Sequence, residues 1–212
     1  GGEGQLRAIF EPRFHRSAES HALALAALNA ASASRTVKPE GDLVAVLRSA
    51  LRSDKAELSE QALGLIGQWQ VVDLHDDVAA LVDDKQSIGA IRLAAVRALG
   101  LLGGDDTKLL AKLIDSGDAT EELKLAALDS LCHVNMSAAA SRVAALLVLG
   151  QATTEVLSPL LNREGGGTAL TAALASHELG AAQAAAALAK LQSLGSSEME
   201  LMNFLSQTAG IK

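Results

Sequence analysis

An all-α fold is predicted by three features of the 212-residue sequence. Apolar residues recur at helical spacing along most of the chain, and strict alternation over the length of a strand is hard to find. Turn residues interrupt this pattern every 12–18 residues, as at 39–42, 103–106 and 165–167. Ala supplies 41 residues and Leu 37, whereas Phe, Trp and Tyr together supply four. A β-sandwich or barrel needs more β-branched and aromatic residues than this.

A repeated apolar motif indicates how the helices are organised. It consists of a small residue, a large apolar residue directly after it, and a second large apolar residue three positions later. Successive copies are 29–38 residues apart, and such even spacing is the signature of a repeat architecture. The copies are Ala24-Leu25 with Leu28, Ala62-Leu63 with Ile66, Ala95-Val96 with Leu99, Ala127-Leu128 with Leu131, the weaker Val156-Leu157 with Leu160, and Ala187-Leu188 with Leu191.

Between the copies lies a second predicted helix with its own apolar pair. Each repeat is therefore predicted to be a helical hairpin of about 30 residues. One hairpin cannot bury both of its faces, but stacked hairpins form a continuous core, and Ala lets neighbouring helices approach closely. The sequence thus predicts an α-α superhelix, a right-handed solenoid of about six hairpins. The second-helix pairs are Val46-Leu47, Ala80-Leu81, Lys112-Leu113, Ala145-Leu146 and Ala173-Leu174.

The whole chain, 1–212, is predicted to form one continuous domain with a cap at each end. Residues 1–18 are interpreted as an N-terminal cap helix, 19–195 as the repeats, and 196–212 as a C-terminal cap helix. Terminal repeats of a solenoid differ from the inner ones because one face has no neighbour. The residues expected to cover the ends are Phe10, Phe14, Met199, Met202 and Phe204.

One stretch resembles a known repeat family. Residues 92–117, RLAAVRALGLLGGDDTKLLAKLIDSG, resemble a short HEAT repeat of the phycobilisome-lyase type, with Arg92 and an Asp at 105 or 106 matching that pattern. The repeats at 62 and 127 are similar but lack the Arg. The resemblance covers most of residues 20–195 and implies a HEAT-like solenoid.

A second resemblance concerns the C-terminal part. Residues 156–212 resemble the closing part of the HEAT region in large exported proteins of planctomycetes. In that family a propeller of the membrane-bound dehydrogenase type precedes this region, and a c-type cytochrome domain with a Cys-x-x-Cys-His haem site follows it. Cys132-His133 lacks the first Cys. The resemblance implies a spacer from a larger redox protein, exported or periplasmic, and the opening residues 1–4 are read as a cut in a longer chain.

The charge balance restricts the partners. The net charge is −7, and residues 60–122 carry twelve acidic and five basic side chains. Nucleic-acid binding requires clustered positive charge, so it is disfavoured. The acidic excess is interpreted first as a solvated loop face, with a basic partner or a cation as the alternative. No run of 18 apolar residues predicts a membrane span.

An acidic segment in the middle of the chain is the first candidate site. His75, Asp76 and Asp77 stand together, with Asp83 and Asp84 close behind. Carboxylates and imidazole can bind a divalent cation, but the residue pattern of an EF-hand loop is absent. The favoured interpretation places Asp76 and Asp77 at the start of a helix, where acidic residues stabilise the helix dipole. A patch for a basic partner is the alternative.

Three further residues are candidates for partner binding. Arg92 and Arg97 lie five apart on one predicted helix, and arginines of stacked repeats usually bond neighbouring loops or Asp side chains. Trp69, the only Trp, follows a repeat helix. Packing in the core or a groove is favoured for it, whereas an exposed Trp would be an anchor for a partner.

Two motifs invite chemical interpretations and have simpler ones. Cys132-His133 contains a nucleophile and a base, but neighbours on a helix point about 100° apart, so a buried thiol at a tight-packing position is favoured. The run 165–167 is all Gly and precedes a predicted helix, where a phosphate can bind. A P-loop would also need a Lys and a preceding strand, so a turn between helices is favoured.

The sequence therefore predicts a non-enzymatic scaffold without cofactor or metal. Its concave face, built from the second helix of each hairpin, would hold another protein or a neighbouring domain. The alternatives are a bilin-lyase-like enzyme and, less favoured, a nucleic-acid-binding HEAT-like protein of the DNA-glycosylase type. The candidate partner-binding residues are Trp69, His75, Asp76, Asp77, Asp83, Asp84, Arg92 and Arg97.

Overall fold

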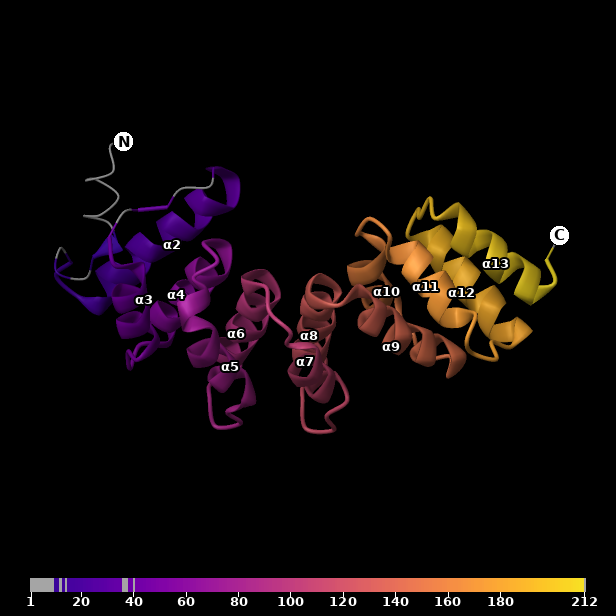
Figure 1. Ribbon diagram of the computed structural model, residues 1–212, viewed down its shortest axis with the longest axis horizontal. Helices are drawn as coiled ribbons and strands as arrows, with labels where there is room; N and C mark the ends of the chain where they lie inside the picture. Colours follow the sequence, from indigo (N-terminus) through magenta and orange to yellow (C-terminus); the bar gives the residue numbers. More distant parts are fainter. Residues whose placement is uncertain (1–9, 12, 14, 36–37, 40, 212) are drawn as a thin grey trace. The chain divides into compact units, whose positions relative to one another are not determined.

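The described part of the chain is all-α. The computed structural model describes residues 10–211 except 12, 14, 36–37 and 40. This part contains twelve α-helices, labelled in Figure 1, one short 3-10 helix (η2), and no strand. The elements are α2 (Ala18–Arg35), α3 (Leu43–Leu51), α4 (Ala56–Gln68), η2 (Val72–Leu74), α5 (His75–Asp83), α6 (Gly89–Leu102), α7 (Thr107–Ile114), α8 (Glu121–Val134), α9 (Met136–Val148), α10 (Thr154–Leu161), α11 (Gly166–Leu174), α12 (Ala181–Ser193) and α13 (Met199–Ala209).

Several helices begin at residues suited to capping. Asp42 accepts a hydrogen bond from the Ala45 amide at 2.9 Å at the start of α3, and Asn135 accepts one from Ala138 at 3.0 Å before α9. Thr120 does the same for α8. These side chains satisfy amides that have no partner within the helix, so they fix where each helix begins.

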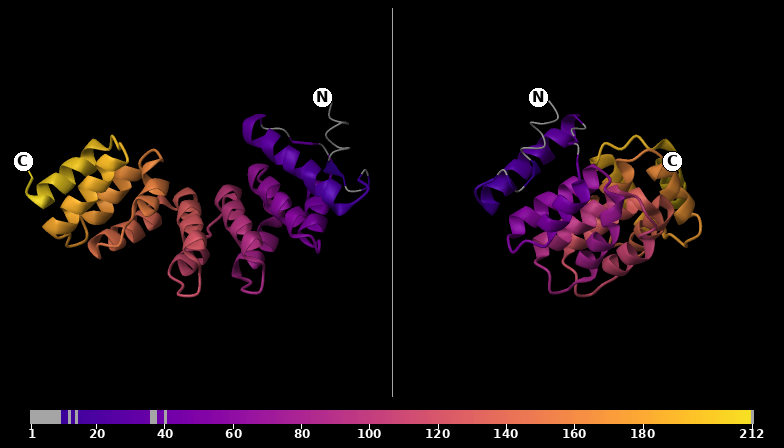
Figure 2. Two further views of the ribbon diagram at one scale, coloured as in Figure 1. Left: turned by 180° about the vertical axis from the view of Figure 1, so that it is seen from behind. Right: turned by 60° about the vertical axis from the view of Figure 1, so that its left-hand side comes forward.

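The chain divides into two compact units, Gly1–Leu109 (unit 1) and Leu110–Lys212 (unit 2). In unit 1, α4 packs between α2 and α6, while α3 packs on α4 and α5 packs on α6. Figure 2 shows the same neighbours from two further sides. The core comes from the predicted motif, since its large residues on these three helices are buried. They are Leu25, Leu28, Leu63, Ile66, Val96 and Leu99.

A close approach between α4 and α6 depends on Gly67. A Cβ on Gly67 would lie 3.1 Å from the Ala98 Cα and 3.2 Å from the Leu101 Cδ1. Such contacts are tighter than ordinary packing allows, so the helices would have to move apart. The absence of a side chain at Gly67 is therefore a contact requirement of the α4–α6 packing.

In unit 2, the helices that pack side by side are α9, α11 and α13. Helix α8 packs on α9 and α10, and α12 packs on α13 and α9. The large motif residues of the last three copies are again buried. They are Leu128, Leu131, Leu157, Leu160, Leu188 and Leu191.

The predicted apolar pairs of the second helices are partly wrong. Helix α5 buries Val78 and Val82, while Ala80 is exposed. Helix α9 buries Val143, Ala144 and Leu147, while Ala145 and Leu146 are only half-buried. The local pattern fixes an apolar stripe, but the neighbouring helices decide which edge of that stripe is covered.

The two chain ends differ from their predicted form. Most of the predicted N-terminal cap helix, including Phe14, lies outside the described residues, and Phe10 is buried as expected. The C-terminal helix α13 exists and packs on α11 and α12, but it buries Leu201 and Leu205. Met199 is 68% exposed, so its predicted covering role is wrong. Met202 and Phe204 are half-buried.

Candidate functional site

Trp69 lies in the core of unit 1, with 6% of its surface exposed. Its indole nitrogen donates a hydrogen bond to Ser32 Oγ at 2.9 Å. The ring of Phe10 packs edge-on against it, with centroids 5.5 Å apart. The core interpretation of Trp69 is confirmed, and the alternative of an exposed anchor for a partner is wrong, because its indole is covered by the chain itself.

His75, Asp76 and Asp77 form the first turn of α5, as the helix-start interpretation predicts. Asp77 accepts a hydrogen bond and ion pair from Arg48 Nε at 3.1 Å. Another nitrogen of Arg48 donates to the Asp73 carbonyl at 3.2 Å. The arginine therefore ties α3 to the start of α5, where acidic side chains already suit the helix dipole.

His75 also bonds to the loop that precedes α7. Its Nε2–H donates to Asp106 Oδ2 at 2.9 Å, and this hydrogen bond raises the pKa of His75 above its ordinary value. Gly104 makes room for the imidazole, since a Cβ there would lie 3.1 Å from His75 Nε2. The carboxylate of Asp106 is buried and has little access to water, so the imidazole of His75 supplies the hydrogen-bond partner that it needs.

Asp84 and Arg92 make contacts on either side of the turn between α5 and α6. Asp84 accepts hydrogen bonds from the Gln86 amide at 2.9 Å and the Ser87 hydroxyl at 2.8 Å, and the Gln86 amide is the main cause of its lowered pKa. Arg92 donates through Nε and Nη2 to the Val82 carbonyl, at 3.2 and 3.1 Å. Arg92 thus bonds the last turn of α5 rather than a loop or an Asp side chain, so the predicted kind of partner is wrong for it.

The last two candidates have exposed side chains, and the residues that the structure describes form no metal cluster. Asp83 is exposed at the end of α5, and Arg97 is exposed on α6. In the part of the chain that the structure describes, no three His, Cys, Asp or Glu side chains are grouped so that they could hold a metal ion. The acidic segment is therefore a set of helix-end and loop contacts rather than a converging site.

Cys132 is a buried thiol, 3% exposed. Burial raises its pKa to about 11, so almost none of it is thiolate at neutral pH. His133 is exposed, and although both residues lie in the described part of the chain, no hydrogen bond joins their side chains. The structural interpretation of this pair is favoured.

The Gly run forms a tight turn that the chain itself fills. Gly165 takes a left-handed backbone with φ of 78° immediately before α11. A Cβ on Gly166 would collide with the Leu160 carbonyl oxygen, and one on Gly167 would collide with the Glu198 carboxylate. Thr168 donates to Glu200 at 3.3 Å. Two carboxylates thus lie at this helix start, which opposes binding of a phosphate.

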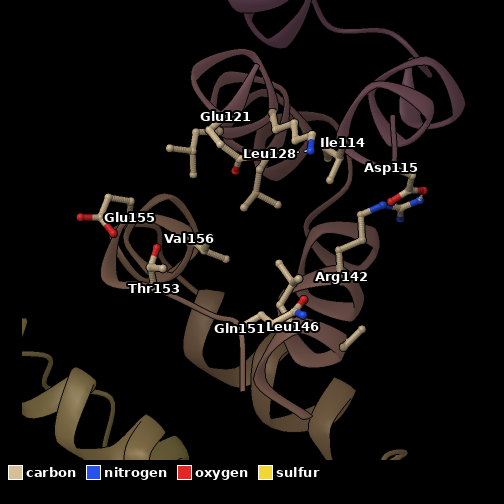
Figure 3. Close-up of a pocket in the computed structure, with 13 residues that line it drawn as sticks. Ile114, Asp115, Glu121, Leu128, Arg142, Leu146, Gln151, Thr153, Glu155 and Val156 are labelled. Atoms are coloured by element: carbon tan, nitrogen blue, oxygen red, sulfur yellow. Dashed lines mark hydrogen bonds and ion pairs between the residues drawn. The ribbon is translucent and has the colours of Figure 1, made fainter. Parts of the chain in front are cut away.

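A groove that the sequence did not indicate lies in unit 2. It has a volume of about 690 Å³ and runs between α8, α9, the start of α10 and the residues that end α7. Its apolar wall is contributed by several elements, as Figure 3 shows for Leu128, Leu146 and Val156. The lining residues are Ile114, Asp115, Glu121, Lys124, Leu125, Leu128, Arg142, Ala145, Leu146, Gln151, Thr153, Glu155 and Val156.

Charged side chains surround this apolar wall. Arg142 pairs with Asp115 at 3.1 Å, and Lys124 pairs with Glu121 at 3.2 Å. Glu155 lies on the opposite side of the groove from Arg142 (Figure 3). A hydrogen bond from Thr153 is the main cause of the lowered pKa of Glu155, which keeps its carboxylate ionised. Arg142 Nε is buried without a hydrogen-bond partner, so one donor at the groove is unused.

One departure from the repeat motif and one difference in burial coincide with the groove. The fifth copy carries Val156 where the others carry Ala, and Val156 is half-buried. The predicted core pair Ala145-Leu146 is also half-buried. Apolar residues that the repeat pattern assigns to the core instead line an open surface, which only the packing of α8, α9 and α10 reveals.

Comparison with known proteins leaves the family assignment as a prediction. No protein-family model matches the chain, and no curated protein matches it. Within the described residues, no helix combines the length and the apolar character needed to cross a lipid bilayer.

Proposed function

We propose that this chain is a HEAT-like α-solenoid segment that acts as a non-catalytic scaffold, holding another protein or a neighbouring domain of a larger polypeptide. The six motif copies lie on alternate helices, α2, α4, α6, α8, α10 and α12. The second-helix pairs lie on the intervening helices α3, α5, α7, α9 and α11. This alternation supports six helical hairpins as the repeating element.

The helices that lie side by side differ between the two units. Helices on the concave side of a curved stack lie closer to one another than those on the convex side. In unit 2 the second helices α9 and α11 lie side by side, which supports the predicted inner face. In unit 1 the first helices α2, α4 and α6 lie side by side, so we propose that the first helices form the inner face there.

The unit 2 groove is the observation that carries the proposed function. It leaves Leu125, Leu146 and Val156 half-buried beside ion pairs, as at the contact surface of a protein with an apolar centre and a polar rim. The lyase-like alternative has less support, since the thiol of Cys132 is buried with a pKa of about 11. The nucleic-acid alternative also has less support, since unit 2 carries ten acidic and six basic side chains.

Site-specific photo-crosslinking in the natural host tests the proposal. A photo-reactive amino acid is placed at Leu146 in the groove and, as a control, at the exposed Leu23 of unit 1. We expect the Leu146 probe to crosslink one defined protein, or a neighbouring domain of the full-length polypeptide, and the Leu23 probe not to capture it. A turnover activity that Cys132→Ala abolishes without loss of helical content would overturn the scaffold proposal.

A further inference from the structure

We propose that the unit 2 groove binds a short segment of a partner protein in which bulky aliphatic side chains are flanked by Lys or Arg. This inference rests on the proposed scaffold function and names the chemistry of the segment that is held. It follows from the apolar wall of the groove, from the charges that surround it, and from the polar groups at its edge.

The apolar wall requires aliphatic side chains in the ligand. Leu125, Leu146 and Val156 come from three different helices and remain half-buried, and the buried Leu128 also lines the groove. Among the described residues that line the groove none is aromatic, so stacking on the groove does not select the ligand. Covering these half-buried side chains with Leu, Ile or Val of a partner removes apolar surface from water on both molecules.

The surrounding charges favour cations beside those aliphatic side chains. Both basic residues of the groove are already neutralised, Arg142 by Asp115 and Lys124 by Glu121. Glu155 is ionised and, within the described residues, forms no ion pair with a basic side chain. A Lys or Arg of the ligand would meet Glu155 directly, whereas an acidic ligand would be repelled by it and would have to break an existing ion pair.

Polar groups at the edge suit a polypeptide. Gln151 and Thr153 line the groove and have exposed side chains that can bond to a peptide backbone. Both lie on the connection between α9 and α10; Thr153 is on the same side of the groove as Glu155, and Gln151 lies beside Leu146 (Figure 3). A peptide can therefore satisfy its amides there while its aliphatic side chains enter the groove.

Three synthetic peptides of equal length test the proposed chemistry with the full chain. In the first peptide, Leu residues are flanked by Lys residues (the Leu/Lys peptide). The second replaces each Lys of the first by Glu (Leu/Glu), and the third replaces each Leu of the first by Ser (Ser/Lys). We expect the Leu/Lys peptide to bind at least about tenfold more tightly than either of the others at physiological salt, by fluorescence anisotropy of the labelled peptides. Equal binding of the Leu/Glu peptide, or equal binding of the Ser/Lys peptide, would overturn the inference.

Groove variants locate the binding. Ala145→Phe fills the groove and should abolish binding. Because the larger Phe side chain can disturb the fold, a second variant, Leu146→Gln, makes the apolar wall polar without adding bulk and should weaken binding. Glu155→Gln should weaken binding about three- to tenfold and reduce its salt dependence. The matched control is Glu164→Gln, an exposed carboxylate outside the groove, which should leave the affinity unchanged. Full binding by both Ala145→Phe and Leu146→Gln would overturn the inference.

The partner from the crosslinking experiment separates this inference from the proposed function. If that partner still binds Ala145→Phe with unchanged affinity, the groove is not its site and the inference fails while the scaffold function stands. If no partner is captured and none of the peptides binds, both fail.

Discussion

His75 Nε2 lies 2.9 Å from Asp106 Oδ2, although the two residues are 31 positions apart in the sequence. The bond joins the first turn of α5 to the loop between α6 and α7. Asp106 is buried and His75 is about one-third exposed, so the pair is only partly screened by water. Its contribution to stability therefore depends on the charge of one imidazole.

His75→Gln should destabilise unit 1 at pH 6 and have little effect at pH 9. The folded-state pKa of His75 is raised above its ordinary value of 6.5, chiefly by the hydrogen bond to Asp106. The stabilisation is fully present below about pH 6.5 and is lost as the pH rises through the folded-state pKa. We expect a loss of about 0.5–1 kcal/mol at pH 6. Urea unfolding followed by circular dichroism at both pH values measures it.

The wild-type protein is the reference for this prediction because other histidines act in the opposite direction. Desolvation lowers the pKa values of the buried His21 and of His133, so both groups make the folded protein less stable as the pH falls. Their effect is common to both proteins and cancels in the difference. A pH-independent difference between wild type and His75→Gln would contradict the prediction.

Gln70→Gly should stabilise the protein by about 0.5–1 kcal/mol. Gln70 is the only non-Gly residue with positive φ among the described residues, at 50°. It closes α4, where the Val71 amide donates to the Ile66 carbonyl at 3.0 Å. Gly150 and Gly195 hold the same place at the ends of α9 and α12, with φ of 70° and 63°. Thermal unfolding of the variant measures the gain.

Gln70→Ala is the matched control for that change. It removes the side-chain hydrogen bond to the Leu101 carbonyl, 3.3 Å in length, but keeps a Cβ in the left-handed region. We expect the Gln70→Ala variant to be no more stable than the wild-type protein. If it is stabilised as much as the Gln70→Gly variant, relief of backbone strain is not the cause of the gain.

Gly166→Ala should destabilise the protein by about 2 kcal/mol or more. The new Cβ would collide with the carbonyl oxygen of Leu160, which belongs to the backbone of α10 and cannot rotate away. Gly89→Ala, at the start of α6, meets no atom within 4 Å and should be neutral or slightly stabilising. Chemical denaturation of both variants checks the contrast, and equal stability of the two would refute it.

Cys132 should resist alkylation in the folded protein. Raising its pKa from 9.0 to about 11 leaves about 100-fold less thiolate at neutral pH, and burial further limits access. Iodoacetamide labelling followed by mass spectrometry should be slow in native buffer and at least about 100-fold faster in urea. Labelling at equal rates in both conditions would show that the thiol is accessible.

The repeat motif predicted the buried faces of the first helices, because a local spacing determines which side of a helix is apolar. Leu63 and Ile66 on α4 illustrate this, since both are fully buried. Ala145 and Leu146 follow the same kind of spacing on α9 yet line a groove, because no neighbouring helix covers that edge. Likewise, the pairing of His75 with Asp106 depends on a tertiary contact that no short motif encodes.

The position of Trp69 against Phe10 in the core of unit 1 also allows the unfolding of unit 1 to be followed separately by fluorescence. Trp69 is the only Trp, and the chain contains no Tyr, so its intrinsic fluorescence arises from this one site. Far-ultraviolet circular dichroism, in contrast, reports helices of both units. Because the two signals report on different residues, one denaturation curve recorded with both gives the stability of unit 1 and of the whole chain from a single unlabelled sample.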